Sequence, residues 1–345
     1  MKDKDKVLLE ILSNDATKVA SCLDFQELAN KKILLTGANG LIGINFLTSL
    51  WQIGIKIPGI TIIPIIHSEP PLYLLPIINS KNVQVLKGDL TNEGFLEKLP
   101  SADIIIHAAG SGEPSKFMIN QFDSLKINSL TTFRLFEKLN ENGRFLFISS
   151  SEIYNGLESP EYSENQIGIT NTDNPRACYI EGKRTGETIC NLYRKQGVNA
   201  FSVRLSLTYG PGVRLGDQRV LPSLIQKALK GKIDLLDSGH ATRTFCYISD
   251  AIELMWYILL YGNSSCYNVG GISTIKIKEL AYLIGKILNV PIVIPKEDTG
   301  IAGAPDSVYL NINRVLSEYN KERFIDLEEG ITRTINWYKN LECIF

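Results

Sequence analysis

Near its start the chain reads Lys32-Ile33-Leu34-Leu35-Thr36-Gly37-Ala38-Asn39-Gly40-Leu41-Ile42-Gly43, a short apolar run followed by three regularly spaced glycines. The apolar run is typical of a buried strand, and the residues from Leu41 to Leu50 are typical of a helix. Glycines between a strand and a helix let the backbone turn tightly and approach a pyrophosphate, which rests on the helix N-terminus. A glycine triplet alone is weak evidence, because ordinary strand–helix turns also contain glycine. In this context, however, it predicts dinucleotide binding.

A second pattern is the pair Tyr179 and Lys183, whose spacing places both residues on one face of a helix. A lysine ammonium beside a phenol favours the phenolate, since an opposite charge stabilises the ionised form. An unperturbed tyrosine titrates near ~10, so working near pH 7 requires its pKa to fall by about 3, or roughly 4 kcal/mol. Lysine alone rarely supplies this, and a cationic oxidised nicotinamide would supply much of the rest. The alternative is a surface tyrosine and lysine without chemistry.

Together these two patterns resemble the extended short-chain dehydrogenase/reductase family, in particular its NAD-dependent nucleotide-sugar epimerases, dehydratases and decarboxylases. Further blocks match that family in order, over about residues 31–340. They are Gly88-Asp89-Leu90, His107-Ala108-Ala109-Gly110, Asn128, Ser149-Ser150-Ser151-Glu152-Ile153-Tyr154, Arg204-Leu205-Ser206, Tyr209-Gly210-Pro211, Arg243-Thr244-Phe245 and Tyr267-Asn268-Val269-Gly270. Jointly the blocks are specific to the superfamily, and much less so to one reaction.

The resemblance implies a role for each matching residue. The catalytic residues that it implies are Tyr179, which accepts the proton, and Lys183, Ser151 and Glu152. Cofactor contacts fall to Gly37, Asn39, Gly40, Leu41, Ile42, Gly43, Asp89, Leu90, His107, Ala108, Ala109, Asn128 and Ser149, together with Tyr179 and Lys183. Substrate contacts fall to Ser150, Arg219 and Arg243. No metal site is expected, since the three histidines lie far apart in the sequence.

Glu152 separates the possible reactions. In this family, dehydratases have Asp-Glu where this chain has Ser151-Glu152, and decarboxylases that act on UDP-glucuronate have Ser-Glu. The segment from Pro175 to Arg184 also resembles the decarboxylase version. The implied reaction oxidises the sugar at C4, releases the carboxylate as CO2, reprotonates C5 and returns the hydride. The alternative for Glu152 is a solvated or capping carboxylate after the strand.

Two positions depart from the family pattern. Leu207 stands where the family usually has an asparagine that touches the sugar nucleotide, and an apolar side chain cannot make that hydrogen bond. Gly303-Ala304 stands where the family usually has an arginine before Pro305-Asp306. Epimerisation, 4,6-dehydration or a simple oxidation or reduction of a sugar nucleotide therefore remain alternatives. A non-catalytic dinucleotide-binding scaffold or sensor is an alternative of another class.

The cofactor expected is NAD, with NADP as an alternative. The second strand should end near His67-Ser68, where neither an acid for the ribose hydroxyls nor an arginine for a 2′-phosphate is found. NAD is preferred because redox-neutral relatives mostly retain it.

Alternating strand and helix patterns predict an α/β fold, a Rossmann-type doubly wound parallel sheet with a smaller mixed C-terminal lobe. The predicted domains are a helical extension at 1–30, a cofactor domain at 31–206 with returns near 243–270, and a substrate lobe at 207–345. Strands are expected at Ile33–Thr36, Ile60–Ile66, Val83–Lys87, Asp103–Ile106, Arg144–Ser149 and Ala200–Leu205. Helices are expected at Ile119–Leu139, Pro175–Gln196, Pro222–Leu229, Ile277–Leu288 and Glu329–Asn340.

Composition limits the function classes. The 345 residues carry a net charge of −1, which gives no broad attraction to nucleic acid or an anionic membrane, and no apolar run is long enough to span a bilayer. The resemblance implies that the partner is a nucleotide diphosphate sugar. Six scattered cysteines without a C-x-x-C pattern fit free thiols and a cytoplasmic location. The resemblance also implies a homodimer, formed through the helices expected at 119–139 and 175–196.

Overall fold

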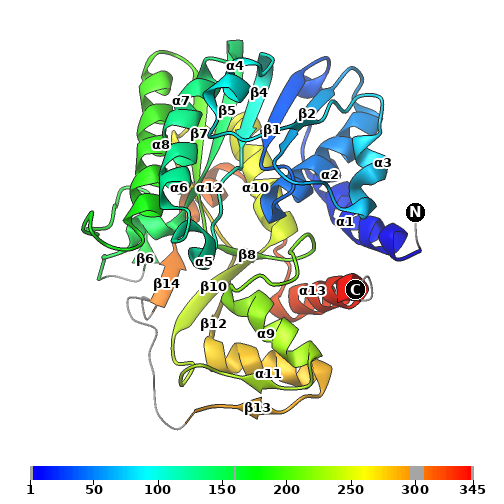
Figure 1. Cartoon of the computed structure of the whole chain (residues 1–345), viewed down its shortest axis with the longest axis vertical. Helices are drawn as coiled ribbons and strands as arrows, with labels where there is room; N and C mark the ends of the chain where they lie inside the picture. Colours follow the sequence, from blue (N-terminus) through cyan, green and yellow to red (C-terminus); the bar gives the residue numbers. More distant parts are fainter. Residues whose placement is uncertain (1–2, 159–160, 296–306, 343–345) are drawn as a thin grey trace.

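The computed structural model describes residues 3–158, 161–295 and 307–342, and Figure 1 shows a large parallel sheet above a smaller lobe. The sheet has seven strands in the order β11-β7-β5-β4-β1-β2-β3. Their bounds are β1 (Lys32–Thr36), β2 (Thr61–Ile66), β3 (Leu86–Lys87), β4 (Ala102–His107), β5 (Leu139–Ser150), β7 (Asn199–Leu205) and β11 (Cys266–Val269). From β1 the chain adds β2 and β3 on one side of the sheet, and it then crosses to β4 and adds β5, β7 and β11 on the other side. Ligands of open α/β sheets bind at such a switch point, beyond the carboxyl ends of the strands.

Helices cover both faces of this sheet because each strand points alternate side chains to opposite faces. Ile33 and Leu35 join one hydrophobic core and Leu34 joins the other. The first core includes residues of α1 (Asp3–Cys22), α2 (Leu41–Lys56), α3 (Leu75–Ile78) and α10 (Ile248–Tyr261). The second core lies beneath α4 (Glu93–Glu97), α6 (Gln121–Asn128), α7 (Leu130–Phe136) and α8 (Ala177–Lys195). Both faces are therefore buried, as a parallel sheet requires.

The smaller lobe is built on a mixed sheet in the order β12-β10-β14-β6, with β8 also paired to β10. Strand β10 runs antiparallel to β12 and parallel to β14 and β8. The bounds are β6 (Glu161–Tyr162), β8 (Leu207–Tyr209), β10 (Thr242–Tyr247), β12 (Ser273–Lys276) and β14 (Ser307–Leu310), with β9 (Ile233–Asp234) and β13 (Ile292–Val293) forming a separate pair. The remaining helices are α5 (Pro114–Phe117), α9 (Val220–Leu229), α11 (Ile277–Leu288), α12 (Asn313–Glu318) and α13 (Leu327–Glu342). The predicted fold class is confirmed.

Two predicted elements differ from the structure. The single helix expected at 119–139 is interrupted at Ser129, whose backbone leaves helical geometry (φ −114°, ψ −82°) and whose hydroxyl donates to the carbonyl of Leu125. The strand expected from Val83 to Lys87 pairs with β2 as a strand only at its last two residues, with an isolated bridge at Val83. Among the described residues, no helix has both the length and the apolar character needed to cross a membrane.

Helix α1 ties the two parts of the molecule together. It packs against α2 and α10 of the large sheet and against α13 of the smaller lobe. The carboxylate of Asp15, which is buried, accepts a hydrogen bond of 2.6 Å from the hydroxyl of Tyr247 and one of 2.7 Å from Arg333. Burial raises the pKa of Asp15, and its bonds to Tyr247 and Arg333 partly offset that rise. The N-terminal extension is therefore part of the packed structure.

Replacing Asp15 by alanine is expected to lower the free energy of unfolding by about 2 kcal/mol, because a charged hydrogen-bond acceptor is lost and Tyr247 keeps a buried hydroxyl without its partner. Urea unfolding followed by circular dichroism measures the change. Asp3→Ala is the matched control, since Asp3 lies on the same helix with a fully exposed side chain. Equal stability of the two variants would contradict the prediction.

Candidate active site

The glycine-rich loop joins β1 to α2 and is shaped by close backbone contacts. Gly37 has a φ of 66°, a conformation that favours glycine, and a Cβ atom there would lie 2.5 Å from the carbonyl oxygen of Ala108. A Cβ atom at Gly43 would overlap the carbonyl oxygen of Gly37. Helix α2 begins at Leu41 with Gly40 as its N-cap, so its free N–H groups face this loop. The loop therefore presents backbone, without side chains, to a phosphate.

Two buried asparagines border the same crevice, and each has one amide oxygen without a partner among the described residues. Asn39 donates 2.8 Å to the carbonyl of Ser68 at the end of β2, and Asn128 donates 2.8 Å to the carbonyl of Ser124. Buried polar atoms are normally hydrogen-bonded. The two free oxygens and the glycine loop fit a dinucleotide, whose ribose hydroxyls and carboxamide are hydrogen-bond donors.

His107 holds the loop after β4 rather than exposing its ring. Its Nδ1 lies 2.8 Å from the hydroxyl of Thr36, and its Nε2 lies 3.0 Å from the carbonyl of Ile127. The Thr36 oxygen accepts from the N–H of Ala109 at 3.1 Å, so its proton points to Nδ1 and the imidazole carries its own proton on Nε2. Burial lowers the pKa of His107 to about 3, which keeps the ring neutral. Because both ring nitrogens of His107 have partners, a cofactor contact by residues 107–109 is expected from the backbone and from Ala108 and Ala109.

Three other predicted cofactor residues already have internal partners. Burial tends to raise the pKa of Asp89, but hydrogen bonds from the N–H and hydroxyl of Thr91 outweigh it and lower that pKa. The carbonyl of Leu90 accepts from Thr131 at 2.7 Å. The hydroxyl of Ser149 donates 2.5 Å to Glu187, which is held by Arg204 in a buried ion pair. Cofactor contacts by these residues remain predictions.

The predicted catalytic pair lies on α8, and Tyr179 is buried against Phe117 at the end of α5. The ring of Tyr179 stacks on Phe117, with centroids 4.5 Å apart and planes within 7°. The Nζ of Lys183 lies 5.5 Å from the centre of the Tyr179 ring and donates 2.6 Å to the carbonyl of Ile148. The Ser150 side chain acts on the pKa of Tyr179, which it lowers against the larger effect of burial. The structure therefore brings Tyr179, Lys183 and the serine segment together at the end of β5.

Burial dominates the acid–base properties of this pair. It raises the pKa of Tyr179 to about 12, and the hydrogen bond from Ser150 only partly offsets it. Burial also lowers the pKa of Lys183 to about 7, against an opposing effect of Glu187. The protein's own charges therefore leave the phenol protonated, and Lys183 alone does not supply the expected activation. A cationic nicotinamide is the charge that sequence reasoning added for this purpose.

The serine segment contains two hydroxyls, those of Ser150 and Ser151, and the sequence alone could not show which one supports the reacting oxygen. Ser150 is the N-cap of the short 3-10 helix Ser151–Tyr154, and its oxygen accepts the N–H of Glu152 at 3.2 Å. The Ser150 side chain also lowers the pKa of Tyr179, so it is the serine of this segment that acts on the predicted catalytic phenol. We propose that Ser150, rather than Ser151, supports the oxygen that becomes a carbonyl.

Glu152 has a partner that sequence reasoning missed. Both carboxylate oxygens accept hydrogen bonds from Arg176, one of them at 3.0 Å from Nε. Arg176 is the N-cap residue of α8, and its guanidinium lies 5.4 Å from the ring centre of Phe117, whose ring also stacks on Tyr179. Glu152, Arg176, Phe117 and Tyr179 thus form a continuous set of contacts. The signal in the sequence was Arg176 one helical turn before Tyr179.

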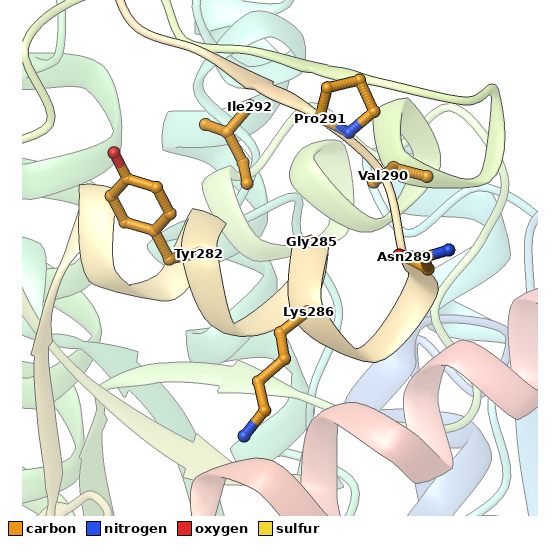
Figure 2. A pocket seen from close by; sticks show the side chains of 7 residues that line it. All are labelled: Tyr282, Gly285, Lys286, Asn289, Val290, Pro291 and Ile292. Atoms are coloured by element: carbon orange, nitrogen blue, oxygen red, sulfur yellow. The ribbon is translucent and has the colours of Figure 1, made fainter.

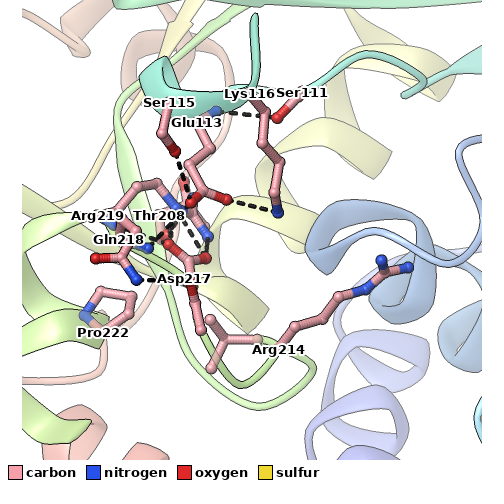
Figure 3. Close-up of polar contacts among 12 residues, drawn as sticks. Ser111, Glu113, Ser115, Lys116, Thr208, Arg214, Asp217, Gln218, Arg219 and Pro222 are labelled. Atoms are coloured by element: carbon pink, nitrogen blue, oxygen red, sulfur yellow. Dashed lines mark hydrogen bonds and ion pairs between the residues drawn. The ribbon is translucent and has the colours of Figure 1, made fainter. Parts of the chain in front are cut away.

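The predicted substrate arginines are both engaged within the protein. Arg219 forms a two-pronged pair with Asp217, at 2.6 Å for the shorter contact, as Figure 3 shows. The nearby carboxylate of Glu113, which is buried, accepts from the N–H of Gln218 at 3.2 Å and joins the loop before α5 to the loop after β8. Arg243 donates 2.8 Å to the carbonyl of Thr242. Gly303, Ala304 and the segment Pro305-Asp306 lie outside the described residues.

A separate hollow of about 500 Å³ lies on the smaller lobe, between α11 and the chain leading into β13 (Figure 2). Its lining includes none of the predicted site residues. It is formed by Tyr282, Gly285, Lys286, Asn289, Val290, Pro291 and Ile292. The candidate active site remains the region between the glycine loop, α8 and the end of β5.

Comparison with known proteins supports this assignment. The model of the "NAD dependent epimerase/dehydratase family" matches residues 33–270, which is more than half of the chain. The chain belongs to this family. It is an NAD-dependent enzyme of the nucleotide-sugar epimerase, dehydratase and decarboxylase group, with the extended short-chain dehydrogenase/reductase fold.

Several relatives illustrate the range of the family. UDP-glucuronic acid decarboxylase 1 of Xenopus tropicalis is 29% identical over 316 residues, covering 90% of this chain and 72% of the relative. A dTDP-4-dehydro-6-deoxy-D-allose reductase of Streptomyces is 28% identical, covering 90% and 97%. The solved UDP-glucuronic acid 4-epimerase of Bacillus cereus, in complex with UDP-glucuronic acid and NAD, has a TM-score of 0.73, 23% identity and coverage of 90% and 99%. At that identity the last likeness shows the fold alone.

In this family member, Ser150→Ala is expected to lower kcat about 10²-fold, because the hydroxyl proposed to support the reacting oxygen would no longer stabilise the developing charge. Ser151→Ala, one residue away on the same turn, is expected to change kcat little. Steady-state kinetics on both variants with an accepted nucleotide sugar measure the difference. The reverse ranking would restore Ser151 to the role that its sequence position first suggested.

Proposed function

We propose that this enzyme converts a nucleotide diphosphate sugar by transient oxidation at C4, and that its reaction resembles the decarboxylation of UDP-glucuronate. The observation that carries the proposal is the set of contacts joining Tyr179, Phe117, Arg176 and Glu152. The Ser-Glu pair at 151–152 and the likeness to curated UDP-glucuronic acid decarboxylases at 26–29% identity support the same reaction.

The chemistry assigns one task to each side chain. A dinucleotide held at the glycine loop of Gly37, Gly40 and Gly43 would supply the hydride acceptor for oxidation at C4 and the hydride for the final reduction. Tyr179 takes the proton of the C4 hydroxyl, and Ser150 donates a hydrogen bond to that oxygen as it becomes a ketone. The bond from C5 to the carboxylate then breaks, CO2 leaves, and its electron pair is accepted by the C4 ketone as an enolate. A proton delivered to C5 and the returning hydride complete a cycle that is redox-neutral overall.

Other reactions of the family are the main alternatives. An epimerase or a 4,6-dehydratase would use the same first oxidation, and the likeness to a Streptomyces reductase favours a simple carbonyl reduction as a further candidate. A scaffold or sensor without turnover is the alternative of another class. The buried pair of Tyr179 and Lys183 argues against it, since a protein without turnover has no use for a phenol and an ammonium held together there.

Incubation of the holoenzyme with UDP-glucuronate is expected to yield CO2 and a UDP-pentose, detected by mass spectrometry. Tyr179→Phe should abolish this conversion, because the variant has no phenolic oxygen to accept the C4 proton. A panel of nucleotide sugars separates the alternatives, since epimerisation leaves the mass unchanged and dehydration removes one water. If UDP-glucuronate stayed intact and another nucleotide sugar of the panel changed in mass, the reaction would be assigned to that sugar instead. Full activity of Tyr179→Phe would refute the oxidative mechanism.

We also propose a homodimer formed through α6, α7 and α8. Large apolar side chains lie exposed on these helices and on the segment before α6, which is unusual for a surface that faces only water. Phe122 is 90% exposed, and others in the same group are Met118, Ile119, Leu125, Leu130, Phe133 and Leu192. Helices α6 and α8 pack side by side, so their outer surfaces are continuous.

The five described cysteines are free thiols, which supports the proposed cytoplasmic location.

Phe122→Glu is expected to convert the dimer to monomer, because it would bury a charge in the proposed interface. Sedimentation velocity measures the change in mass. Ile55→Glu is the matched control, since Ile55 is also an exposed apolar residue, 67% accessible, but lies on α2. A monomeric wild-type chain, or dissociation by both variants alike, would contradict an interface at α6–α8.

A further inference from the structure

The loop after β8 places an arginine from the smaller lobe against the cofactor loop. Arg214 donates 2.7 Å from Nη2 to the main-chain carbonyl of Asn39, although 175 positions separate the two residues in the sequence. Asn39 lies between Gly37 and Gly40 of the glycine-rich loop. Figure 3 shows the Arg214 side chain extended away from the pair formed by Arg219 and Asp217. No motif in the sequence predicted this contact.

The backbone on either side of Arg214 is anchored by three hydrogen bonds. The carbonyl of Pro211 accepts from Asn45 of α2 at 2.9 Å. The carbonyl of Val213 accepts from the indole of Trp337 at 2.8 Å, and that of Arg214 accepts from the hydroxyl of Tyr338 at 3.2 Å. The loop is thus fixed to the first turns of α2 on one side and to α13 on the other. The anchored main chain keeps the Arg214 guanidinium at the glycine loop, although Arg214 is an exposed residue.

The charge balance at this position is unusual. None of the ion pairs among the described residues involves Arg214, whereas Arg219 five residues later is paired with Asp217. The N-terminus of α2 already carries a partial positive charge from its free N–H groups. A second cation beside it is unfavourable unless an anion binds there. A guanidinium is well suited to that task, because its planar donors match phosphate oxygens.

A second observation points to a ligand at the same place. The side chain of Asn39 is 5% exposed, and its Oδ1 atom has no hydrogen-bond partner among the described residues. An unpaired buried oxygen costs free energy unless a ligand donor completes it. The unpaired acceptor fits a hydroxyl donor of a bound dinucleotide, such as a ribose hydroxyl, while Arg214 and the helix N-terminus fit its phosphates.

We propose that Arg214 binds the diphosphate of the dinucleotide cofactor and closes it onto the glycine loop. The substrate also carries a diphosphate, but the contact of Arg214 is made to Asn39 in the cofactor loop, while the predicted substrate arginine, Arg219, lies with Asp217. Because Arg214 belongs to the smaller lobe, it makes cofactor retention depend on the packing of that lobe against α2. The inference does not depend on which sugar is converted.

Calorimetric titration of the full-length protein, freed of copurified dinucleotide, tests the proposal. Arg214→Met is expected to weaken ADP binding about tenfold or more, because a charge-assisted hydrogen bond to phosphate is lost, and to leave adenosine binding unchanged. Arg214→Lys should recover part of the affinity, since a point charge replaces the planar donor set. Arg323→Met, which removes an exposed arginine of the smaller lobe, is the control and should leave ADP binding as in the wild type.

Titration with UDP separates the two sources of diphosphate. Unchanged UDP affinity in Arg214→Met supports a cofactor contact, whereas a loss for UDP without a loss for ADP would place Arg214 in the substrate site and overturn the proposal. Unchanged ADP affinity would overturn it as well. Thermal unfolding adds a readout without turnover. The rise in Tm caused by NAD should shrink in Arg214→Met, while the Tm without NAD stays close to the wild-type value. If the Tm values with and without NAD fell by the same amount, Arg214 would have a structural role instead.

Discussion

The close approach of two backbone segments, the glycine loop and the end of β4, is the constraint on which the rest of the site depends. A side chain at Gly37 would collide with the carbonyl of Ala108, so the loop and the strand end fit only when that position is glycine. The hydroxyl of Thr36 then links the two through Ala109 and His107. This contact lies at the switch point of the sheet, and it places the free N–H groups of α2 beside the ends of β4 and β5. A ligand there meets backbone dipoles on one side and the catalytic helix on the other.

The catalytic helix is held in turn by a buried ion pair. Glu187 lies two turns beyond Tyr179 and one turn beyond Lys183, and it binds Arg204 of β7 and the hydroxyl of Ser149 at the end of β5. This pair fixes α8 against β5 and β7, and the serine segment follows the end of β5. The result is a site of low polarity, in which burial raises the pKa of Tyr179 and lowers that of Lys183. Proton removal from a sugar hydroxyl in such a site depends on positive charge brought by the cofactor, which couples cofactor binding to catalysis.

Sequence periodicity was sufficient for most strands and long helices, because their patterns are local. It failed at Ser129, where the chain bends although its apolar spacing continues, and at Val83–Lys87, where the edge strand pairs only at its end. The glycine loop and the Tyr179–Lys183 pair were predictable since each is a short motif with its own geometry. Arg176 and Arg214 were not, because their importance arises from residues brought near by folding, such as Glu152 and Asn39. The effect of burial on Lys183 was likewise invisible before the packing of α8 was known.

The pairing of Glu152 with Arg176 bears on the choice among reactions. Dehydration of a C4 ketone requires a base to remove the C5 proton, and both oxygens of the Glu152 carboxylate are already engaged by Arg176. Decarboxylation requires no such base, because the electron pair of the breaking bond passes directly to the ketone. It does require that the substrate carboxylate sit near Glu152 without strong repulsion, and Arg176 cancels the charge that would cause it. We infer that the pair favours loss of CO2 over loss of water, and that the neutral Ser151 beside it is consistent with the same preference.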